Sequence, residues 1–341
     1  KVNLHGRQLK RRYLVIESDD WGSIRMPDLK TYKELLAMGI RVDKCPYNRF
    51  DTLASLDDLS ELFSVLSSFK DYKGNTPVVT TNFNVANPDF RKMQLTDYTV
   101  YSYETFIDTL HKYYPTEDVW GFWRKGIAEG LVYPQFHGRE HVNIKMWMQL
   151  LKENNKAVRA AAERNAFGLS YICSPLIQKP YLAALSTCTE VDVHTVGNII
   201  KDGARIFSEI FEFNSRSFIA PMYTWDSALL PYFKDAGIRY MQGANIQKSY
   251  NCFDYSIRKF SHIFGSKSSN GIVYLNRNCS FEPSIYGMSY DIQSTISQIS
   301  RAFYFNKPAV LSAHRLNFIG ALNIKNRTNN LEKLSDLLKT V

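Results

Sequence analysis

Short apolar runs alternate with amphipathic stretches along most of this chain. Residues 13–16 form a continuous apolar run typical of a buried strand, and residues 28–38 repeat apolar side chains at helical spacing. Residues 55–69 repeat the helical pattern, and residues 77–81 are again typical of a strand. Strand, helix and strand in this order predict a parallel β/α arrangement, in which each helix connects two strands of one sheet.

The same alternation continues toward the C-terminus. Further strands are predicted at 131–136, 217–223, 238–241, 271–275 and 308–314, and further helices at 101–113, 143–151, 155–164, 196–213, 226–236 and 292–305, with another ending at 130. The sequence contains no internal repeat, low-complexity tract or linker. We therefore expect one α/β domain over residues 1–341, with insertions at about 82–130 and 155–215.

Polar clusters follow four of the predicted strands. They are Asp19 with Asp20, His137 with His141, Pro221 to Tyr223, and His314. In an α/β barrel the carboxyl ends of the strands share one face, so we expect these groups to converge. Two adjacent carboxylates repel each other, so the first cluster predicts either a bound cation or a carboxyl group with a raised pKa.

The two histidines are separated by three residues. At helical spacing this places both imidazoles on one side, about 6 Å apart, which suits zinc or a similar divalent ion. One carboxylate and two histidines leave coordination positions open for water and substrate, as in catalytic metal sites. Structural readings remain open for single residues: Asp19 can cap the following turn, Asp20 can pair with an arginine, and His314 can be a hydrogen-bonded histidine at a strand end.

In this order the clusters resemble the motifs of the polysaccharide deacetylases of the NodB-homology type, carbohydrate esterase family 4. The resemblance covers about residues 13–315, with long insertions, and implies a distorted (β/α) barrel. It implies that a divalent metal, above all zinc with cobalt, nickel or manganese as alternatives, is held by three ligands, Asp20, His137 and His141. It also implies that Asp19 is the general base and His314 the general acid.

The third family motif, Arg-x-Pro-aromatic, is similar to residues 219–223. It implies that Pro221, Met222 and Tyr223 form a wall of the substrate groove, with the backbone N–H of Met222 or Tyr223 as the oxyanion donor. The family has arginine where this chain has Ile219, so the arginine that pairs with the catalytic aspartate must come from elsewhere.

Several residues beside the motifs are further candidates. Arg25, Arg139 and Arg315 are the candidates for the missing arginine, and Trp21, Arg139 and Trp225 for contacts with the substrate. Core packing is the alternative for both tryptophans. Glu282 follows a predicted strand, and the motifs assign it no role.

The activity implied by the resemblance is metal-dependent removal of acetyl groups from the N-acetylated sugars of a poly- or oligosaccharide. A leaving amine needs a proton from His314 more than a sugar hydroxyl does, which mildly favours an N-acetyl substrate. Two alternatives stay open: an O-acetyl polysaccharide esterase using the same site, and a glycan-binding module of the same fold that has lost catalysis. The missing motif arginine is the main argument for the module.

Composition limits the protein class and the partners. The 341 residues are 45% hydrophobic and 22% charged, which is typical of a globular protein, and no apolar run is long enough for a transmembrane segment. The formal net charge is +9, with basic residues scattered except at 10–12. This indicates either a solvated basic surface or attraction to an anionic partner, such as an acidic polysaccharide, a membrane surface or nucleic acid. Nucleic acid ranks last, because no binding motif is present.

The five cysteines are widely spaced and form no CxxC pair, so we expect neither a disulfide framework nor a thiolate zinc site. Free cysteines slightly favour a reducing, cytoplasmic compartment. The chain opens at Lys1 without a signal-like segment, so we expect a processed form. A periplasmic or extracellular location would follow if a signal peptide had been removed.

Overall fold

Eight parallel strands form the central sheet in the computed structural model, which describes residues 2–341. Their order across the sheet is β10-β7-β6-β5-β2-β1-β12-β11. Their bounds are β1 (Leu14–Trp21), β2 (Val79–Phe83), β5 (Val132–Phe136), β6 (Ser217–Ile219), β7 (Tyr240–Gly243), β10 (Val273–Asn276), β11 (Cys279–Ser280) and β12 (Ala309–His314). The expected α/β class with a parallel sheet is confirmed.

The two edge strands of this sheet are consecutive in the chain. Only Arg277 and Asn278 connect β10 at one edge to β11 at the other. Two residues span only about 7 Å, so the sheet must curl until its edges approach each other. The N–H of Arg277 donates to Gly243 O on β7, and the N–H of Asn278 donates to Val310 O on β12. These two residues therefore close the distorted barrel.

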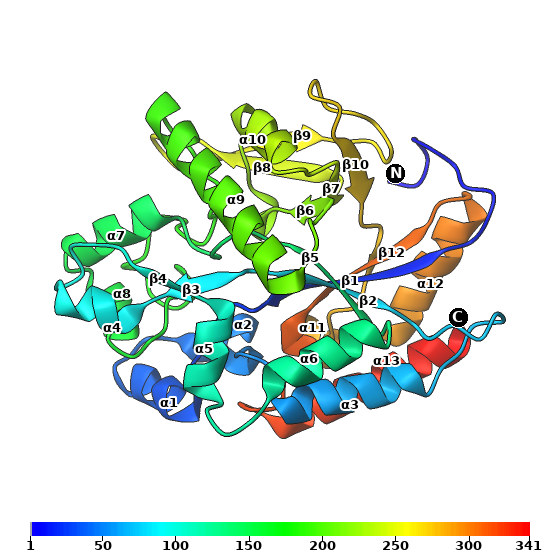
Figure 1. Cartoon of the computed structure of the whole chain (residues 1–341), viewed down its shortest axis with the longest axis horizontal. Helices are drawn as coiled ribbons and strands as arrows, with labels where there is room; N and C mark the ends of the chain where they lie inside the picture. Colours follow the sequence, from blue (N-terminus) through cyan, green and yellow to red (C-terminus); the bar gives the residue numbers. More distant parts are fainter. Residues whose placement is uncertain (1) are drawn as a thin grey trace.

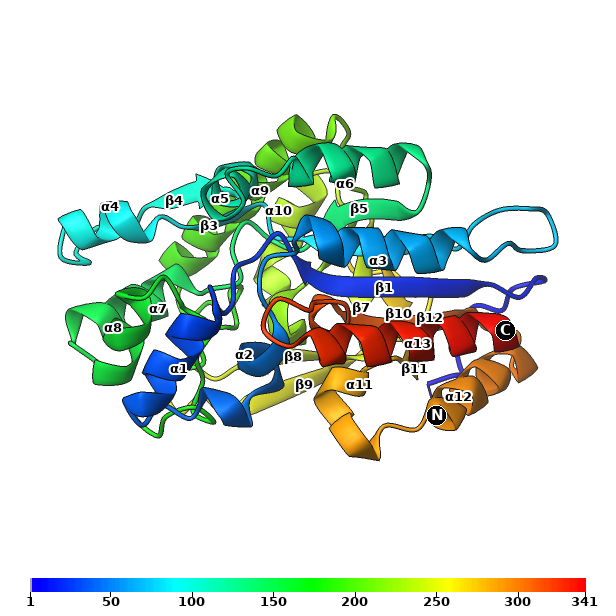
Figure 2. The same cartoon turned by 90° about the horizontal axis from the view of Figure 1, so that it is seen from below.

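Helices cover the outside of the sheet and one of its ends (Figures 1 and 2). They are α1 (Leu29–Ala37), α2 (Pro46–Phe50), α3 (Leu56–Ser67), α4 (Phe90–Leu95), α5 (Phe106–Tyr113), α6 (Val119–Ala128), α7 (Ile144–Lys152), α8 (Lys156–Ala162), α9 (Glu190–Phe211), α10 (Leu230–Asp235), α11 (Pro283–Tyr286), α12 (Ile292–Tyr304) and α13 (Ile324–Thr340). Two hairpins are added, β3 (Ala86–Pro88) with β4 (Tyr103–Thr105) and β8 (Ile246–Tyr250) with β9 (Ile257–Ser261).

Local sequence explains where the helices begin. The side chain of Asp28 accepts a hydrogen bond from Thr31 N at the start of α1, as its position before the apolar pattern predicts. Ser55 and Asp58 form a capping box at the start of α3. Along α3 the buried positions include Leu59, Leu62 and Leu66, so one face of the helix packs on the sheet.

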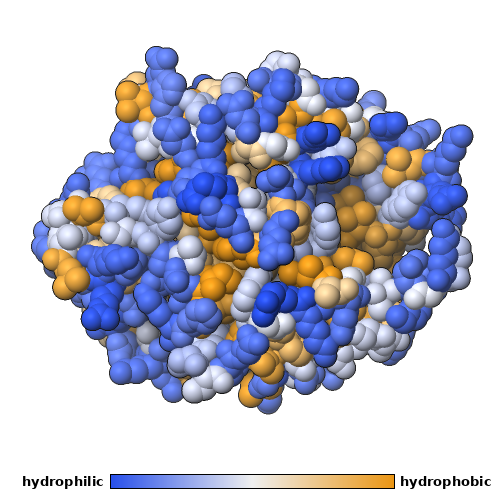
Figure 3. Space-filling view, in the orientation of Figure 1, coloured by the Kyte–Doolittle hydropathy of each residue, from blue (hydrophilic) through white to orange (hydrophobic). Residues whose placement is uncertain are grey.

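Strand β1 runs toward the half of the molecule that carries α1, α2, α7 and α8 (Figures 1 and 2). Buried apolar residues form two clusters, one centred on the sheet and a second that includes Trp147 and residues of α1, α7 and α8. The face in Figure 3 is mainly hydrophilic, with apolar side chains gathered toward its centre and in a hollow on its right side. Among residues 2–341, no helix combines the length and apolar character needed to cross a bilayer.

Several elements differ from the sequence-based prediction. The strand predicted at 217–223 ends at Ile219 and is followed by a 3-10 turn over Pro221–Tyr223. The β8–β9 hairpin, β11 and α13 were not predicted. Strand β11 has only two residues, too short for a periodic pattern, and the apolar positions of α13 are diluted by polar ones.

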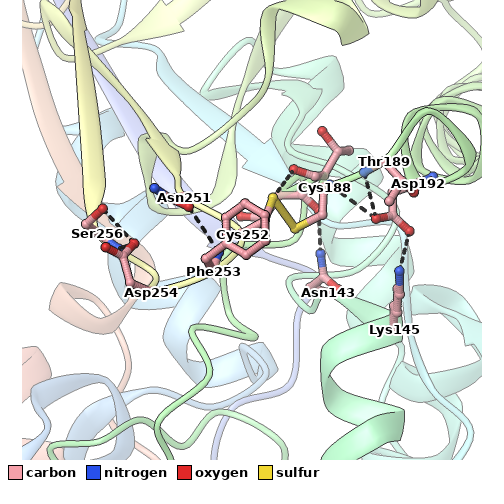
Figure 4. The surroundings of a disulfide bond; sticks show 12 residues. Asn143, Lys145, Cys188, Thr189, Asp192, Asn251, Cys252, Phe253, Asp254 and Ser256 are labelled. Carbon is pink, nitrogen blue, oxygen red and sulfur yellow. Dashed lines mark hydrogen bonds and ion pairs between the residues drawn. A yellow bond between two sulfur atoms is a disulfide. The ribbon is translucent and has the colours of Figure 1, made fainter.

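The cysteine prediction was wrong in one respect, because Cys188 and Cys252 form a disulfide. They lie 64 positions apart in the sequence. Their approach depends on the β8–β9 hairpin, whose connecting turn carries Cys252 to Cys188, two residues before the start of α9 (Figure 4). Cysteine spacing alone could not show this contact. Cys45, Cys173 and Cys279 are free and buried.

Candidate active site

Asp19 and Asp20 lie near the end of β1, and their carboxylates belong to two different clusters. The pairing of β1 with β2 shifts register between Ser18 and Trp21, and Asp20 adopts a left-handed conformation with φ 72°. A residue other than glycine in this conformation costs of order 1 kcal/mol or more, and such strain concentrates at functional sites. The irregularity frees the two adjacent side chains from the strict alternation of a strand.

Asp20 lies against His137 and His141. Its Oδ1 atom is 3.3 Å from His137 Nε2 and 3.4 Å from His141 Nε2, and all three residues are buried. One ligand atom from each lies within 4.8 Å of the others. The imidazole centroids are 5.4 Å apart, close to the predicted separation, but the predicted helical placement was wrong. The two histidines lie on the loop between β5 and α7, where Gly138 has φ 106°.

The hydrogen bonds of the histidines fit a divalent cation. His137 Nδ1 donates to Ile219 O over 2.8 Å, so Nε2, which lies 3.3 Å from Asp20 Oδ1, is the ring nitrogen available to a metal. Burial, together with the charge of Arg25, lowers the pKa of His141 to about 3, so this ring is neutral. Within residues 2–341, His141 Nδ1 has no hydrogen-bond partner. A carboxylate and two imidazoles thus converge at one buried point, which is a donor set typical of a catalytic zinc site.

Arg25 supplies a positive charge at the same point. Its Nη2 atom lies 3.3 Å from Asp20 Oδ2 and 3.4 Å from His141 Nε2. Burial alone would raise the pKa of Asp20, but the positive charge of Arg25 is the largest opposing effect, and the net pKa lies well below its usual range. Arg25 therefore compensates the negative charge of the Asp20 carboxylate. It also contacts His141 Nε2, the nitrogen that a metal would use.

Asp19 is held by Arg277, a residue that the sequence motifs did not indicate. Arg277 Nη1 and Nη2 donate to the two carboxylate oxygens over 2.6 and 2.7 Å, and its Nε donates to Glu17 over 2.7 Å. Asn82 adds a hydrogen bond of 2.8 Å to Asp19. Burial raises the pKa of Asp19, but Arg277 outweighs it, so the net pKa is lowered.

The three arginines proposed as the partner of Asp19 all pair elsewhere. Arg25 contacts Asp20, Arg139 pairs with Glu140 and Asp202, and Arg315 pairs with Asp51. Arg277 was missed because it lies far along the chain from every motif. The signal that could have found it is its position directly after the predicted strand at 271–275.

His314 ends β12 beside Asp19 and bonds to Glu282. Its Nδ1 lies 2.5 Å from Glu282 Oε1, and its Nε2 lies 3.8 Å from Asp19 Oδ2 and 3.3 Å from the Tyr47 hydroxyl. Burial lowers the pKa of His314, but the charge and hydrogen bond of Glu282 outweigh it and raise that pKa to about 9. Glu282 therefore orients His314 and keeps it protonated at neutral pH. As with Arg277, its position just after a strand was the available signal.

Residues 221–223 lie next to this cluster. The Tyr223 hydroxyl lies 3.2 Å from Ser312 Oγ and accepts from Arg277 Nη1 over 3.3 Å. Met222 and Tyr223 both have positive φ, 59° and 54°, and Met222 is 45% exposed whereas Pro221 is buried. The turn thus exposes Met222, buries Pro221 and directs the hydroxyl of the partly buried Tyr223 to Arg277.

The remaining substrate-contact candidates are buried. Trp21 is 1% exposed, packs on Trp123 and Phe318, and donates to Ser18, so it belongs to the core. Trp225 is 4% exposed and stacks on His262 and Tyr274. Arg139 packs over the Tyr103 ring at 4.0 Å while its charge is paired with two carboxylates. Both tryptophans therefore have the core packing that was their alternative, and the charge of Arg139 is paired within the fold.

No family model and no curated protein matches this sequence. The chain is similar in structure to 4-α-glucanotransferase from Thermococcus litoralis, with 9% identity and a TM-score of 0.44 over 98% of this chain and 38% of that one. It is similar to a CE4 family pseudoenzyme from Bacillus anthracis, with 6% identity and a TM-score of 0.35 over 97% and 62%. It is also similar to a putative polysaccharide deacetylase from Mycobacterium smegmatis, with 9% identity and a TM-score of 0.39 over 98% and 87%.

This chain thus spans less than two thirds of the first two of these proteins. Because the identities and TM-scores are this low, the likenesses say nothing of its activity.

Proposed function

We propose that this chain is a metal-dependent hydrolase that removes acetyl groups from the N-acetylated sugars of a poly- or oligosaccharide. The observation that carries the proposal is the position of Asp19. It is held by Arg277 on one side, lies 3.8 Å from His314 on another, and adjoins the ligand set of Asp20 in sequence. A base, an acid and a metal-ligand set at one buried point are the groups that amide hydrolysis requires.

Asp20, His137 and His141 would hold the metal. When bound, a divalent ion supplies Lewis acidity toward the acyl oxygen and toward water. The chain prepares this ligand set by fixing the His137 tautomer through Ile219 O and by keeping His141 neutral through burial.

Asp19 would be the general base. Arg277 keeps its carboxylate ionised, and Asn82 and Arg277 fix its orientation through hydrogen bonds. An ionised, oriented carboxylate can accept the proton of an attacking water. Arg277 thus takes the role that the motif arginine, absent at Ile219, is expected to have.

His314 would be the general acid. With its pKa raised to about 9 by Glu282, the ring carries a proton at neutral pH. Nδ1 is engaged by Glu282, so Nε2 is the nitrogen that can deliver a proton to the leaving amine.

Met222 is the better candidate for the oxyanion donor. The N–H of Tyr223 donates to Ala220 O over 2.9 Å, so it is already engaged. This leaves the backbone N–H of Met222, in a strained turn next to Tyr223, whose hydroxyl contacts Arg277, as the candidate for stabilising a developing negative charge.

The same groups could hydrolyse an O-acetyl ester, so an O-acetyl polysaccharide esterase remains the second candidate. The main argument for a binding module that has lost catalysis was the missing arginine. The ion pair between Arg277 and Asp19 removes that argument.

The proposal is tested by an acetate-release screen over N- and O-acetylated glycans, both neutral and acidic, with and without a chelator. We expect acetate release from an N-acetylated glycan, its loss with the chelator and its recovery with zinc. Release from O-acetylated glycans alone would favour the esterase, and glycan binding without release would favour the module.

Two histidine variants sharpen the screen. His314→Gln should lower turnover by about 10²-fold or more while leaving bound metal unchanged. His194→Gln is the control, because His194 lies on the surface of α9 and bonds to Tyr232. Equal turnover in both variants would refute the acid role of His314.

A further inference from the structure

A large apolar cavity of about 580 Å³ lies between α7 and the first half of α9. Its size falls within the range of about 300–1,000 Å³ found for small-molecule sites. Most of its surface is apolar, and the buried members of its wall include Val142, Met146, Leu185, Val196 and Ile200. Such a wall favours a hydrocarbon, because removing apolar surface from water is the main gain on binding.

One polar atom in this wall lacks a partner. Ser186 is 8% exposed and lines the cavity, and its Oγ makes no hydrogen bond to any residue in the described range 2–341. The backbone oxygen of the same residue accepts a hydrogen bond from Asn143 Nδ2 over 2.9 Å, so the hydroxyl is the group that still lacks a bond within the described residues. A buried hydroxyl without a partner is unfavourable, and a ligand with one hydrogen-bonding group would supply the missing bond.

The cations in the wall are already paired. Lys145 Nζ lies 2.7 Å from Asp192 Oδ1, as Figure 4 shows, and the Arg139 guanidinium is paired with Glu140 and Asp202. The cavity therefore offers no unpaired positive charge to an anionic end group. An uncharged end group fits better, because it loses less hydration on entering an apolar site.

The Cys188–Cys252 disulfide keeps the cavity walls together. Cys188 lines the cavity just before α9, and Tyr255, from the connection between β8 and β9, lines it from the other side. The disulfide ties these two segments to each other (Figure 4). A cavity held by a covalent bond loses less conformational entropy when a ligand fills it.

We propose that this cavity is a binding site for an aliphatic chain that carries one uncharged hydrogen-bonding end group, such as a primary alcohol. The chain lies along the apolar wall, and the end group bonds to Ser186 Oγ. The cavity wall includes residues 138–140, between His137 and His141 in the sequence, but none of the three ligands themselves, so binding there requires neither metal nor turnover.

The test is a titration of the full chain with decan-1-ol, followed by the methyl signals of ¹³C-labelled methionine. Met146 lies in the wall and should show a saturable shift, whereas Met288, which is fully exposed, should not move. Decanoate, with the same chain and a charged end, should bind more weakly. No saturable shift of Met146, or tighter binding of decanoate, would overturn the proposal.

Variants separate the cavity from nonspecific binding. Thr195→Trp places a large ring on the exposed side of the cavity wall and should weaken decan-1-ol binding at least about ten-fold. Thr328→Trp is the matched control, because both threonines are exposed and bond to the backbone oxygen four residues earlier. Ser186→Ala should weaken binding about five-fold through loss of the hydroxyl. Parent-like affinity of Thr195→Trp would also contradict the proposal.

Discussion

Arg277 and Asp19 form a buried, bidentate ion pair although 258 positions separate them in the sequence. Arg277 is also one of the two residues that connect the edge strands of the sheet. The segment that closes the barrel therefore also positions the proposed general base. An error in closing the barrel would displace Arg277 and release Asp19.

Arg277→Lys should damage the proposed base more than the fold. Lysine keeps the positive charge but cannot donate to both carboxylate oxygens in a fixed plane, so the pKa of Asp19 should rise. In the parent, the lowered pKa keeps Asp19 ionised well into the acidic range. The acidic limb of the kcat/KM profile should therefore move to higher pH in the variant, with turnover reduced about 10²-fold at pH 6.

A second buried arginine provides the control for this variant. Arg315 holds Asp51 through bonds of 2.8 and 2.9 Å and is fully buried, but it does not contact Asp19. Arg315→Lys should lower the free energy of unfolding by a similar amount without moving the acidic limb. If both variants shift the limb equally, Arg277 acts through stability alone.

Glu282→Gln should lower the pKa of His314. In the parent this pKa is raised from 6.5 to about 9, with the charge and hydrogen bond of Glu282 overcoming the effect of burial. A raised histidine pKa stabilises the fold below pH 6.5, and this contribution is lost as the pH rises through 9. The variant should therefore be less stable than the parent at pH 6, and the difference should shrink above pH 9.

The measurement is an NMR titration of the His314 ring, together with urea unfolding at pH 6 and above pH 9. The His262 ring is the internal control, because its Nε2 bonds to Gln247 and not to Glu282. An unchanged His314 titration in the variant would contradict the assigned role of Glu282.

The sequence predicted those features of the structure that depend on local sequence patterns. Apolar periodicity and capping residues predicted α1 and α3, and parallel pairing at strand ends predicted that Asp20, His137 and His141 would lie together. The rest depends on contacts between distant segments. Arg277 pairs across the barrel closure and Glu282 across the β11–β12 pair, and neither contact has a spacing that a sequence pattern could show.

The burial of individual side chains was the other property that the sequence could not predict. A tryptophan beside a catalytic motif can stack on sugar or fill the core, and composition does not distinguish the two. Trp21, which follows the left-handed Asp20, packs on Trp123 in the core. For the histidine pair, the predicted separation of the two rings was close to the observed one, but the predicted cause was wrong. A helix was expected, whereas a glycine-containing loop holds the two rings at this distance.

Arg25→Gln should strengthen metal binding. Arg25 places a positive charge 3.3 Å from Asp20 and 3.4 Å from His141 Nε2, so it competes with a cation for both. Without metal, the variant should be less stable than the parent, because the buried Asp20 carboxylate loses its compensating charge. Zinc affinity, measured by competition with a chromophoric chelator, should rise by about ten-fold or more, and zinc should raise the Tm by more than in the parent.

The conservative variant separates charge from shape at this position. Arg25→Lys keeps a positive charge near Asp20 and should leave zinc affinity near that of the parent. Weaker zinc binding in Arg25→Gln would show instead that Arg25 supports the ligand set.

Cys188→Ser should destabilise the fold and loosen the wall of the apolar cavity. The disulfide closes a loop over 64 positions, and loss of such a cross-link costs about 2–4 kcal/mol in the free energy of unfolding. Urea unfolding of the parent with and without a reductant should show the same loss, whereas the variant should not respond to the reductant. Cys279→Ser is the control, because Cys279 is buried and free. If the reductant leaves the parent unchanged, the disulfide does not contribute to its stability.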